Sequence, residues 1–318
     1  MKKMRRTNYN NTSIMNLKQK LISILNKLPY IRGIYQDNVI FKRNSCFPPG
    51  HFYSTIVSVD DVKNRQNKIW SNEDIDGING VDLNVDEQIK LVKQFEKYYG
   101  EIPFTENKNN NNRYYFENEY YSYTDAIFLY SMIRHFTPKQ IIEIGSGFSS
   151  SIMLDTNEQF FNNSINLTFI EPYTDRLKSL LKGNDNKTTT VIEKNVQEVN
   201  IETFEKLNHG DFLFIDSTHV VKTGSDVNYI FFEILPKLKS GVLIHFHDIF
   251  YPFEYPKDWV FMGKNWNEDY FLRAFLMYNN EFEIRLFSHY LHKHRKEVFN
   301  NMPLCYKNTG GNLWLMKK

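Results

Sequence analysis

The sequence predicts an α/β protein built on one mostly parallel sheet. From Asp125 onward, short apolar runs alternate with segments long enough to form helices. Runs of this kind are typical of parallel strands that are buried on both faces. The chain has 318 residues, of which 41% are hydrophobic and 24% charged, so it can bury a sizeable core. We therefore expect a doubly wound sheet of seven strands with helices on both faces.

The expected strands follow one another in a regular order along this region. Five parallel strands are predicted at Gln140–Ile144, Leu167–Ile170, Thr189–Ile192, Phe212–Ile215 and Val242–Phe246. Two final strands are predicted at Phe282–Phe287 and Asn312–Met316. A domain of about 190 residues has an ordinary size for this architecture.

The part of the chain before the sheet begins with a basic segment. Residues 1–20 contain six Lys or Arg and no acid. They lead into a helical stripe, which Pro29 is expected to end and which consists of Ile14, Leu17, Leu21, Leu25 and Leu28. We expect this basic amphipathic helix to cover a core or a subunit neighbour, as in a homo-oligomer. The alternative is that it lies on an anionic membrane surface.

A second helix and a boundary follow. Val85–Tyr99 has an apolar stripe at helical spacing, Asn84 and Glu87 form a capping-box pattern, and Gly100 follows the end. The polar run from residue 107 to residue 112 is the best candidate boundary. We therefore expect a helical and loop cap at residues 1–112 and a ligand-binding domain at residues 113–318.

Composition and charge exclude several classes of protein. The chain has 39 Lys and Arg against 37 Asp and Glu, so its net charge of +2 does not favour nucleic acid. No apolar run approaches the ~20 residues of a membrane span, and the N-terminus lacks the apolar core of a secretion signal. Cys46 and Cys305 suggest neither a disulfide framework nor a zinc site. We expect reduced thiols and a cytoplasmic location.

The ends of the first two strands carry a ligand-binding pattern. In doubly wound sheets, ligands bind beyond the carboxyl ends of the strands. Gly145 and Gly147 permit a tight turn there and close approach of the backbone to a ligand. Glu171 ends the second run, where an acid can hold a ribose diol. An NAD site shares this logic, but Glu143 directly before the turn would repel a pyrophosphate and attract a cationic ligand such as S-adenosylmethionine.

As an ordered set, these residues resemble the class I S-adenosylmethionine-dependent methyltransferases. The set is Glu143-x-Gly145-x-Gly147, then Glu171, Asp216 after the fourth run and His247-Asp248 after the fifth. Within that class, Phe214-Ile215-Asp216-Ser217-Thr218-His219 and Ile244-His245-Phe246-His247-Asp248-Ile249 resemble the branch called methyltransferase family 24. The likeness covers about residues 125–318 and implies a Rossmann-like methyltransferase fold.

The resemblance also implies roles for single residues toward the cofactor S-adenosylmethionine. Glu143 would face the amino end of its methionine part, with the backbone of Gly145, Ser146 and Gly147 against the same moiety. Glu171 would bind the ribose hydroxyls, Asn195 and Val196 would flank the adenine, and Asp216 would also contact the cofactor. In the same enzymes, segments like residues 49–54 and 121–125 precede the domain, and we expect them to shape the acceptor pocket.

Polar side chains at the fourth and fifth strand ends suggest two mechanisms of methyl transfer, which requires alignment and removal of one proton. In the first, Asp216, His247 and Asp248 hold a divalent ion, Mg²⁺ or Mn²⁺, which lowers the pKa of the acceptor hydroxyl. His247 stands where related enzymes usually have an acid, and imidazole is a poor Mg²⁺ ligand. In the second, His219 or His247 is a general base oriented by Asp216 or Asp248. We favour His219 because Asp-x-x-His resembles the pattern of metal-assisted sugar O-methyltransferases. A His–Asp pair that only fastens strand ends is the structural alternative.

The leading hypothesis is an O-methyltransferase that acts on a small polar acceptor, a sugar or glycan precursor. Aromatic residues crowd the segment from Phe250 to Tyr270 and could stack on a sugar ring. An NAD-dependent oxidoreductase and a non-catalytic cofactor-binding scaffold are the alternatives. The later histidines, His289, His292 and His294, are expected to form a solvated basic face.

Overall fold

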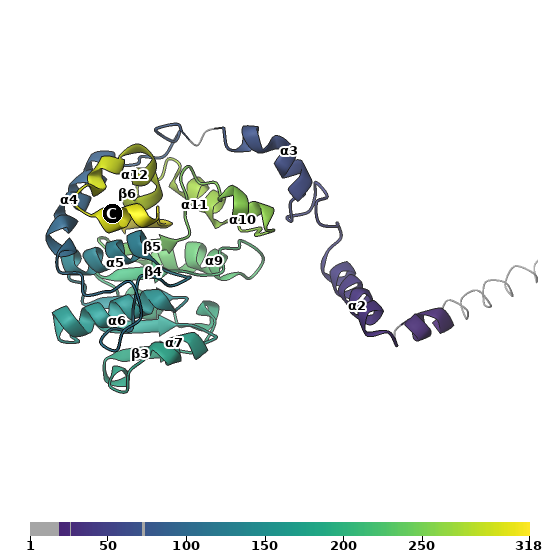
Figure 1. Cartoon of the computed structure of the whole chain (residues 1–318), viewed down its shortest axis with the longest axis horizontal. Helices are drawn as coiled ribbons and strands as arrows, with labels where there is room; N and C mark the ends of the chain where they lie inside the picture. The colour runs from purple at the N-terminus through teal and green to yellow at the C-terminus, as the bar shows by residue number, and fades with distance from the viewer. Residues whose placement is uncertain (1–18, 26, 72–73) are drawn as a thin grey trace, which may run out of the picture. The chain divides into compact units, whose positions relative to one another are not determined.

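The computed structural model describes residues 19–25, 27–71 and 74–318 (Figure 1). The chain divides into two compact units, Met1–Val62 and Lys63–Lys318. The boundary expected at residue 112 does not coincide with this division, because helix α4 (Val85–Tyr99) packs against α5 (Tyr123–Phe136) and strand β6 (Phe282–Phe287). Residues 63–112 are therefore part of the same compact unit as the sheet.

The first unit contains a helix that the sequence did not predict. Residues 19–25 are helical, and α2 follows at Pro29–Asn44. Pro29 does not simply end the first helix, since it occupies the first turn of α2, where its missing N–H costs no hydrogen bond. Ile14 and Leu17 of the expected stripe lie outside the described residues. Helix α3 (Val59–Ile69) then leads into the second unit.

The second unit contains the predicted seven-stranded sheet. The strands are β1 (Gln140–Ile144), β2 (Asn166–Ile170), β3 (Thr189–Ile192), β4 (Phe212–Ile215), β5 (Leu243–His247), β6 and β7 (Asn312–Lys317). Their spatial order is β3-β2-β1-β4-β5-β7-β6, with β1 to β5 parallel and β7 antiparallel to both of its neighbours. The predicted strands are confirmed to within one residue at either end. The order reverses between β1 and β4, so a ligand site is expected at their carboxyl ends.

Helices cover both faces of this sheet (Figure 1). The remaining helices of the second unit are α6 (Phe148–Phe161), α7 (Asp175–Leu180), α8 (Glu202–Glu205), α9 (Asp226–Tyr229), α10 (Lys257–Phe261), α11 (Glu268–Leu276) and α12 (Ser288–His294). Helix α5 packs beside α4 and α6, and Phe136 at its end contacts Phe212 of β4. On the opposite face, Phe231 after α9 contacts Phe246 of β5 and Phe271 of α11.

The predicted capping box at the start of α4 is wrong. Asn84 has a φ of 51°, in the left-handed region, and its side chain makes no capping hydrogen bond. Its amide instead donates to the carbonyl oxygen of Ile284 in β6 at 3.1 Å. Glu87 pairs with Lys90 on the exposed surface of the helix. Asn84 therefore fastens α4 to the sheet, and α4 is held by its buried residues Leu91, Val92 and Phe95.

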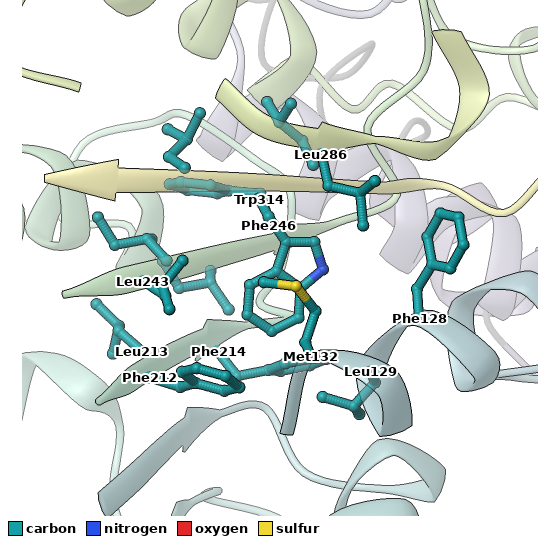
Figure 2. Packing of buried hydrophobic residues seen from close by; sticks show 14 of the residues in the cluster. Phe128, Leu129, Met132, Phe212, Leu213, Phe214, Leu243, Phe246, Leu286 and Trp314 are labelled. Carbon is teal, nitrogen blue, oxygen red and sulfur yellow. The ribbon is translucent and has the colours of Figure 1, made fainter. Parts of the chain in front are cut away.

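The core fills both faces of the centre of the sheet. Figure 2 shows Phe128, Leu129 and Met132 of α5 close to side chains of four strands. On the α5 face the strand residues are Phe212, Phe214, Leu243, Leu286 and Trp314, whereas Leu213 and Phe246 point to the other face, and all are at most 1% exposed. Burial of each such side chain contributes about 1.5–3 kcal/mol to folding. Because these side chains pack tightly, the central strands and their carboxyl ends are held in fixed positions.

Candidate active site

The glycine turn after β1 lies against the end of β4. Gly145 has a φ of 81°, and a Cβ atom at this position would stand 1.8 Å from the carbonyl oxygen of Asp216. The backbone N–H of Asp216 donates to the carbonyl oxygen of Ile144 at 2.9 Å. Only glycine fits this contact, because any side chain would overlap the neighbouring backbone. The glycine turn after β1 and the carboxyl end of β4 therefore pack directly against each other through backbone atoms.

Glu171 extends this unit from the end of β2. Its carboxylate accepts hydrogen bonds from the backbone N–H groups of Ser146 at 3.1 Å and Tyr173 at 2.7 Å. The carboxylate lines a pocket of about 400 Å³, together with Gly145, Asn195, Val196, Asp216 and Ser217. The structure thus brings together the residues predicted for the ribose and the adenine. Their contacts with a ligand stay a prediction.

Glu143 does not line this pocket. It is fully buried behind the turn, where its carboxylate accepts hydrogen bonds from the hydroxyl groups of Ser149, at 2.6 Å, and Ser150. Burial raises the pKa of Glu143 to about 8, although the serine hydrogen bonds lower it. In the structure Glu143 anchors the glycine turn to α6, and the expected contact with a ligand's amino group stays a prediction.

A second pocket of about 360 Å³ adjoins the first. The two share Gly145, Glu171, Asp216, Ser217 and Thr218 as lining residues. The second pocket adds polar groups from the ends of β4 and β5 and aromatic rings around them, namely Ser146, Gly147, Tyr120, Tyr121, Trp266, Arg176, His219, His247 and Asp248. A ligand that spans both pockets would therefore have one end beside these polar groups.

His219 is at the centre of the polar cluster. Its Nδ1 lies 2.8 Å from Oε2 of Glu268, and its Nε2 lies 3.5 Å from Oδ1 of Asp216 and 3.8 Å from Oδ2 of Asp248. Burial lowers the pKa of His219, but the interactions with Asp216 and Glu268 outweigh it and raise the pKa well above its usual value. Its φ of 60° is in the left-handed region, which is strained for histidine. Such strain is typical of functional sites.

His247 and Asp248 complete the cluster from the end of β5. Nε2 of His247 lies 3.6 Å from Oδ1 of Asp248, and the ring of His247 packs 4.9 Å from the ring of Tyr121. Burial lowers the pKa of His247, but the neighbouring carboxylates, Asp248 first, raise it above its usual value. Asp248 is more exposed to the pocket than either histidine. All of the predicted catalytic residues therefore meet in one place.

The predicted metal ligands do not fit a metal site in this arrangement. Over residues 19–25, 27–71 and 74–318, no group of three His, Cys, Asp or Glu side chains could hold a metal ion. The carboxylates of Asp216 and Asp248 instead both approach Nε2 of His219, at 3.5 Å and 3.8 Å. His247 is also a poor ligand for Mg²⁺.

Glu268 is a site residue that the sequence did not reveal, whereas Trp266 belongs to the aromatic segment that was expected near the site. Glu268 begins α11 and is 1% exposed, while the ring of Trp266 packs 4.5 Å from that of His219. Glu268 is 49 residues from His219 along the chain. Its signal was weak, since Glu268-Asp269 is only a pair of acids at a helix start, where acids are common.

Residues 121–125, at the start of α5, were expected to line the acceptor pocket, and only part of this segment does so. Tyr121 lines the second pocket. Asp125 instead faces the start of β7, where its carboxylate accepts hydrogen bonds from the N–H of Gly311 at 2.9 Å and from the side chain of Asn312 at 2.7 Å. Residues 49–54 belong to the first unit, and their expected place over the cofactor stays a prediction.

Together, the fold and the pockets define an enzyme class that binds a nucleoside-containing cofactor at the switch point of a doubly wound sheet. Residues 142–249 match the model of a family described as a methyltransferase domain. An uncharacterized protein of Archaeoglobus fulgidus is 34% identical over 190 residues, which cover 59% of this chain and 84% of that protein. On the match of residues 142–249, the chain carries a class I S-adenosylmethionine-dependent methyltransferase domain. A methyltransferase domain argues against the NAD-dependent oxidoreductase.

Two solved structures are similar to the chain at low identity. One is the O-methyltransferase TomG of Streptomyces achromogenes, involved in tomaymycin synthesis, in complex with S-adenosylmethionine. It is 11% identical, with 80% of this chain and 96% of that chain covered and a TM-score of 0.41. The other is a methyltransferase of Podospora anserina bound to S-adenosylhomocysteine. It is 14% identical, with 86% and 99% covered and a TM-score of 0.39. Family membership rests on the matched domain and not on these distant structures.

The residues of the two pockets fit the cofactor of this family. The hydroxyl group of Ser217 is buried beside the turn without a hydrogen-bond partner, so a bound ligand can satisfy it. Gly145 and Glu171 line both pockets, and a carboxylate at the end of the second strand is able to accept hydrogen bonds from a ribose. No helix in the described part of the chain combines the length and apolar character needed to cross a bilayer.

Proposed function

We propose that the protein transfers a methyl group from S-adenosylmethionine to a hydroxyl of a small polar acceptor, a sugar or glycan precursor. The observation that carries this proposal is the second pocket, because it joins a buried His–carboxylate cluster to aromatic walls beside the glycine turn. Its volume of about 360 Å³ suits a small molecule. Tyr120, Tyr121 and Trp266 offer rings on which a sugar can stack.

When bound, the cofactor supplies an electrophilic methyl group, and the chain must align the acceptor and remove its proton. Glu268 accepts the hydrogen bond from Nδ1–H of His219, which fixes the ring and leaves Nε2 directed at Asp216 and Asp248. Nε2 is then the atom that receives the proton of the acceptor hydroxyl. Asp216 and Asp248 stabilise the imidazolium that results. Glu268 acts through His219 and is a positioning residue.

This mechanism predicts how the rate depends on pH. His219 must be neutral to accept a proton, and its carboxylate neighbours raise its pKa well above the usual value. The rate should therefore rise with pH as His219 loses its proton through that raised pKa. His247 has a less strongly raised pKa and is the second candidate for the base.

Binding and transfer can be tested separately. Calorimetry with S-adenosylhomocysteine tests the cofactor, and mass spectrometry of mixtures with S-adenosylmethionine and a panel of sugars, nucleotide sugars, phenols and amines tests the acceptor. His219→Gln should abolish transfer and keep binding, whereas the exposed His209→Gln should keep both. Methylation of amines alone would refute O-methyl transfer. Cofactor binding without transfer to any acceptor would favour the non-catalytic scaffold.

The remaining predictions concern the metal ion and the cellular setting. Because the donor set does not fit a metal, dialysis against EDTA should leave the rate unchanged. A loss that Mg²⁺ or Mn²⁺ restores would reinstate the ion as a cofactor. We infer a cytoplasmic location, and association of two copies through the first unit stays a prediction that sedimentation can test.

A further inference from the structure

The two units of the chain differ sharply in charge. Residues 1–62 contain 10 Lys and Arg against 3 Asp and Glu, whereas residues 63–318 contain 29 against 34. The first unit therefore carries a net charge of +7 and the second a net charge of −5. The overall charge of +2 conceals this separation. A block of one sign on a short segment is typical of a surface that binds a partner of the opposite sign.

The same unit exposes apolar side chains along its helices. None of the residues of α2 is buried, and Tyr30 and Ile34 lie one turn apart on the same side of the helix, with Tyr35 also exposed. Tyr30 is 79% exposed and Ile34 is 52% exposed. The preceding helical segment, residues 19–25, also exposes Leu21 and Ile24. Single exposed apolar residues are ordinary, but a series along neighbouring helices marks an interaction surface.

An exposed aromatic cluster follows α2 in the same unit. The rings of Phe47 and His51 stack at 4.9 Å, and those of Phe52 and Tyr53 lie 4.0 Å apart. Phe52 and Tyr53 are 81% and 65% exposed. Aromatic side chains with this exposure suit the interface between lipid headgroups and acyl chains. Two basic residues, Lys42 and Arg43, lie in the last turn of α2, shortly before this cluster in the sequence.

Charge and apolar exposure together restrict the occupant of this surface. A second copy would bring two segments of +7 together, and their repulsion opposes that contact. A nucleic acid would match the charge but leave the Leu, Ile and Phe side chains in water. An anionic bilayer surface satisfies both, because its headgroups pair with Lys and Arg while the apolar side chains enter the interface. We propose that residues 1–62 bind the protein peripherally to anionic membranes.

Vesicle flotation of the full chain tests this proposal independently of methyl transfer. Vesicles of phosphatidylcholine alone are compared with vesicles that contain phosphatidylglycerol, at low and high salt. We expect at least tenfold tighter binding to the anionic vesicles, and a loss of at least fivefold in 0.5 M salt, because salt screens the basic residues. Equal binding to both vesicles, or to neither, would overturn the proposal.

Two variants and a matched control locate the surface. The variant Ile34→Ser/Tyr35→Ser/Phe52→Ser should lose at least tenfold in vesicle binding, and Lys42→Glu/Arg43→Glu should lose a similar amount. Phe232→Ser/Met262→Ser removes two exposed apolar side chains from the second unit and should bind vesicles as the parent chain does. Cofactor binding by calorimetry should stay unchanged throughout, which shows that each variant folds.

The other occupants have distinct outcomes. If the first two variants dissolve a dimer seen by sedimentation and vesicles are not bound, the surface belongs to a second copy and the proposal falls. If the chain binds duplex DNA or RNA with the same variants impaired and ignores vesicles, the partner is a nucleic acid. Failure of methyl transfer with vesicle binding intact would refute only the proposed function.

Discussion

The buried ion cluster around Arg113 gives the sharpest prediction for stability. Arg113 is 3% exposed, and its guanidinium contacts Asp155 at 2.6 Å and Asp185 at 2.6 Å, both of which are buried. It also reaches the half-exposed Glu158 at 2.7 Å. Arg113→Met would leave the carboxylates of Asp155 and Asp185 without their cation. Removal of one partner from a buried ion pair costs about 3–5 kcal/mol.

Thermal and urea unfolding of the full chain measure this loss. At roughly 2–4 °C per kcal/mol for a unit of this size, the melting temperature should fall by roughly 6–20 °C. The control is Lys178→Met, since its partner Glu193 and Lys178 itself are both more than half exposed. Loss of that surface pair should cost about 0–1 kcal/mol. The double variant Arg113→Met/Asp155→Asn should recover part of the stability, because it removes one unpaired charge.

A small effect would refute this reasoning. Asp155 keeps the hydrogen bonds from the backbone N–H groups of Arg113 at 2.7 Å and Tyr114 at 2.9 Å. If these two bonds suffice for the carboxylate, Arg113→Met will fall within 1 kcal/mol of the control. The ion cluster would then contribute no more to stability than an exposed ion pair does. The loop that precedes α5 would be held by its aromatic packing alone.

Three further predictions concern the site. Gly145→Ala should abolish binding of S-adenosylhomocysteine in calorimetry because its Cβ would overlap the carbonyl of Asp216, whereas Gly183→Ala, with nothing within 4 Å, should bind normally. Glu171→Gln should weaken the binding of S-adenosylhomocysteine by about 10- to 100-fold, as expected for loss of a charged hydrogen-bond acceptor worth about 1.5–3 kcal/mol. Unchanged affinity would place the ribose elsewhere. Glu268→Gln should lower kcat about 10²-fold with little change in KM. The rise of the rate with pH should also move to lower pH, because the Glu268 carboxylate helps to raise the pKa of His219. An unmoved pH profile would show that Glu268 has only a structural role.

The sheet could be predicted because its strands are short apolar runs buried on both faces. β4 is the clearest case, since all four of its residues are buried. The order of the strand ends then indicated which polar residues would meet, and Asp216, His219, His247 and Asp248 do line one pocket. Local sequence sufficed here because parallel strands place successive carboxyl ends at one edge.

Residues that act through tertiary contacts could not be predicted in this way. Asn84 matches a capping residue locally, but its amide finds Ile284 across the fold. His289 and His292 were expected on a solvated basic face, and instead burial lowers the pKa of each to about 4. Glu268 reaches His219 only because the start of α11 meets the loop after β4, where the N–H of Glu268 donates to the carbonyl oxygen of His219 at 3.2 Å. No spacing along the chain encodes such pairs.

The contact between Gly145 and the carbonyl of Asp216 has a consequence for how the enzyme can change. It joins the glycine turn to the end of β4 through backbone atoms, so this frame does not depend on which side chains line the second pocket. Tyr120 and Trp266 come from separate loops outside that frame. Exchange of these two rings should therefore redirect the enzyme to acceptors of other shapes while the transfer step is left intact.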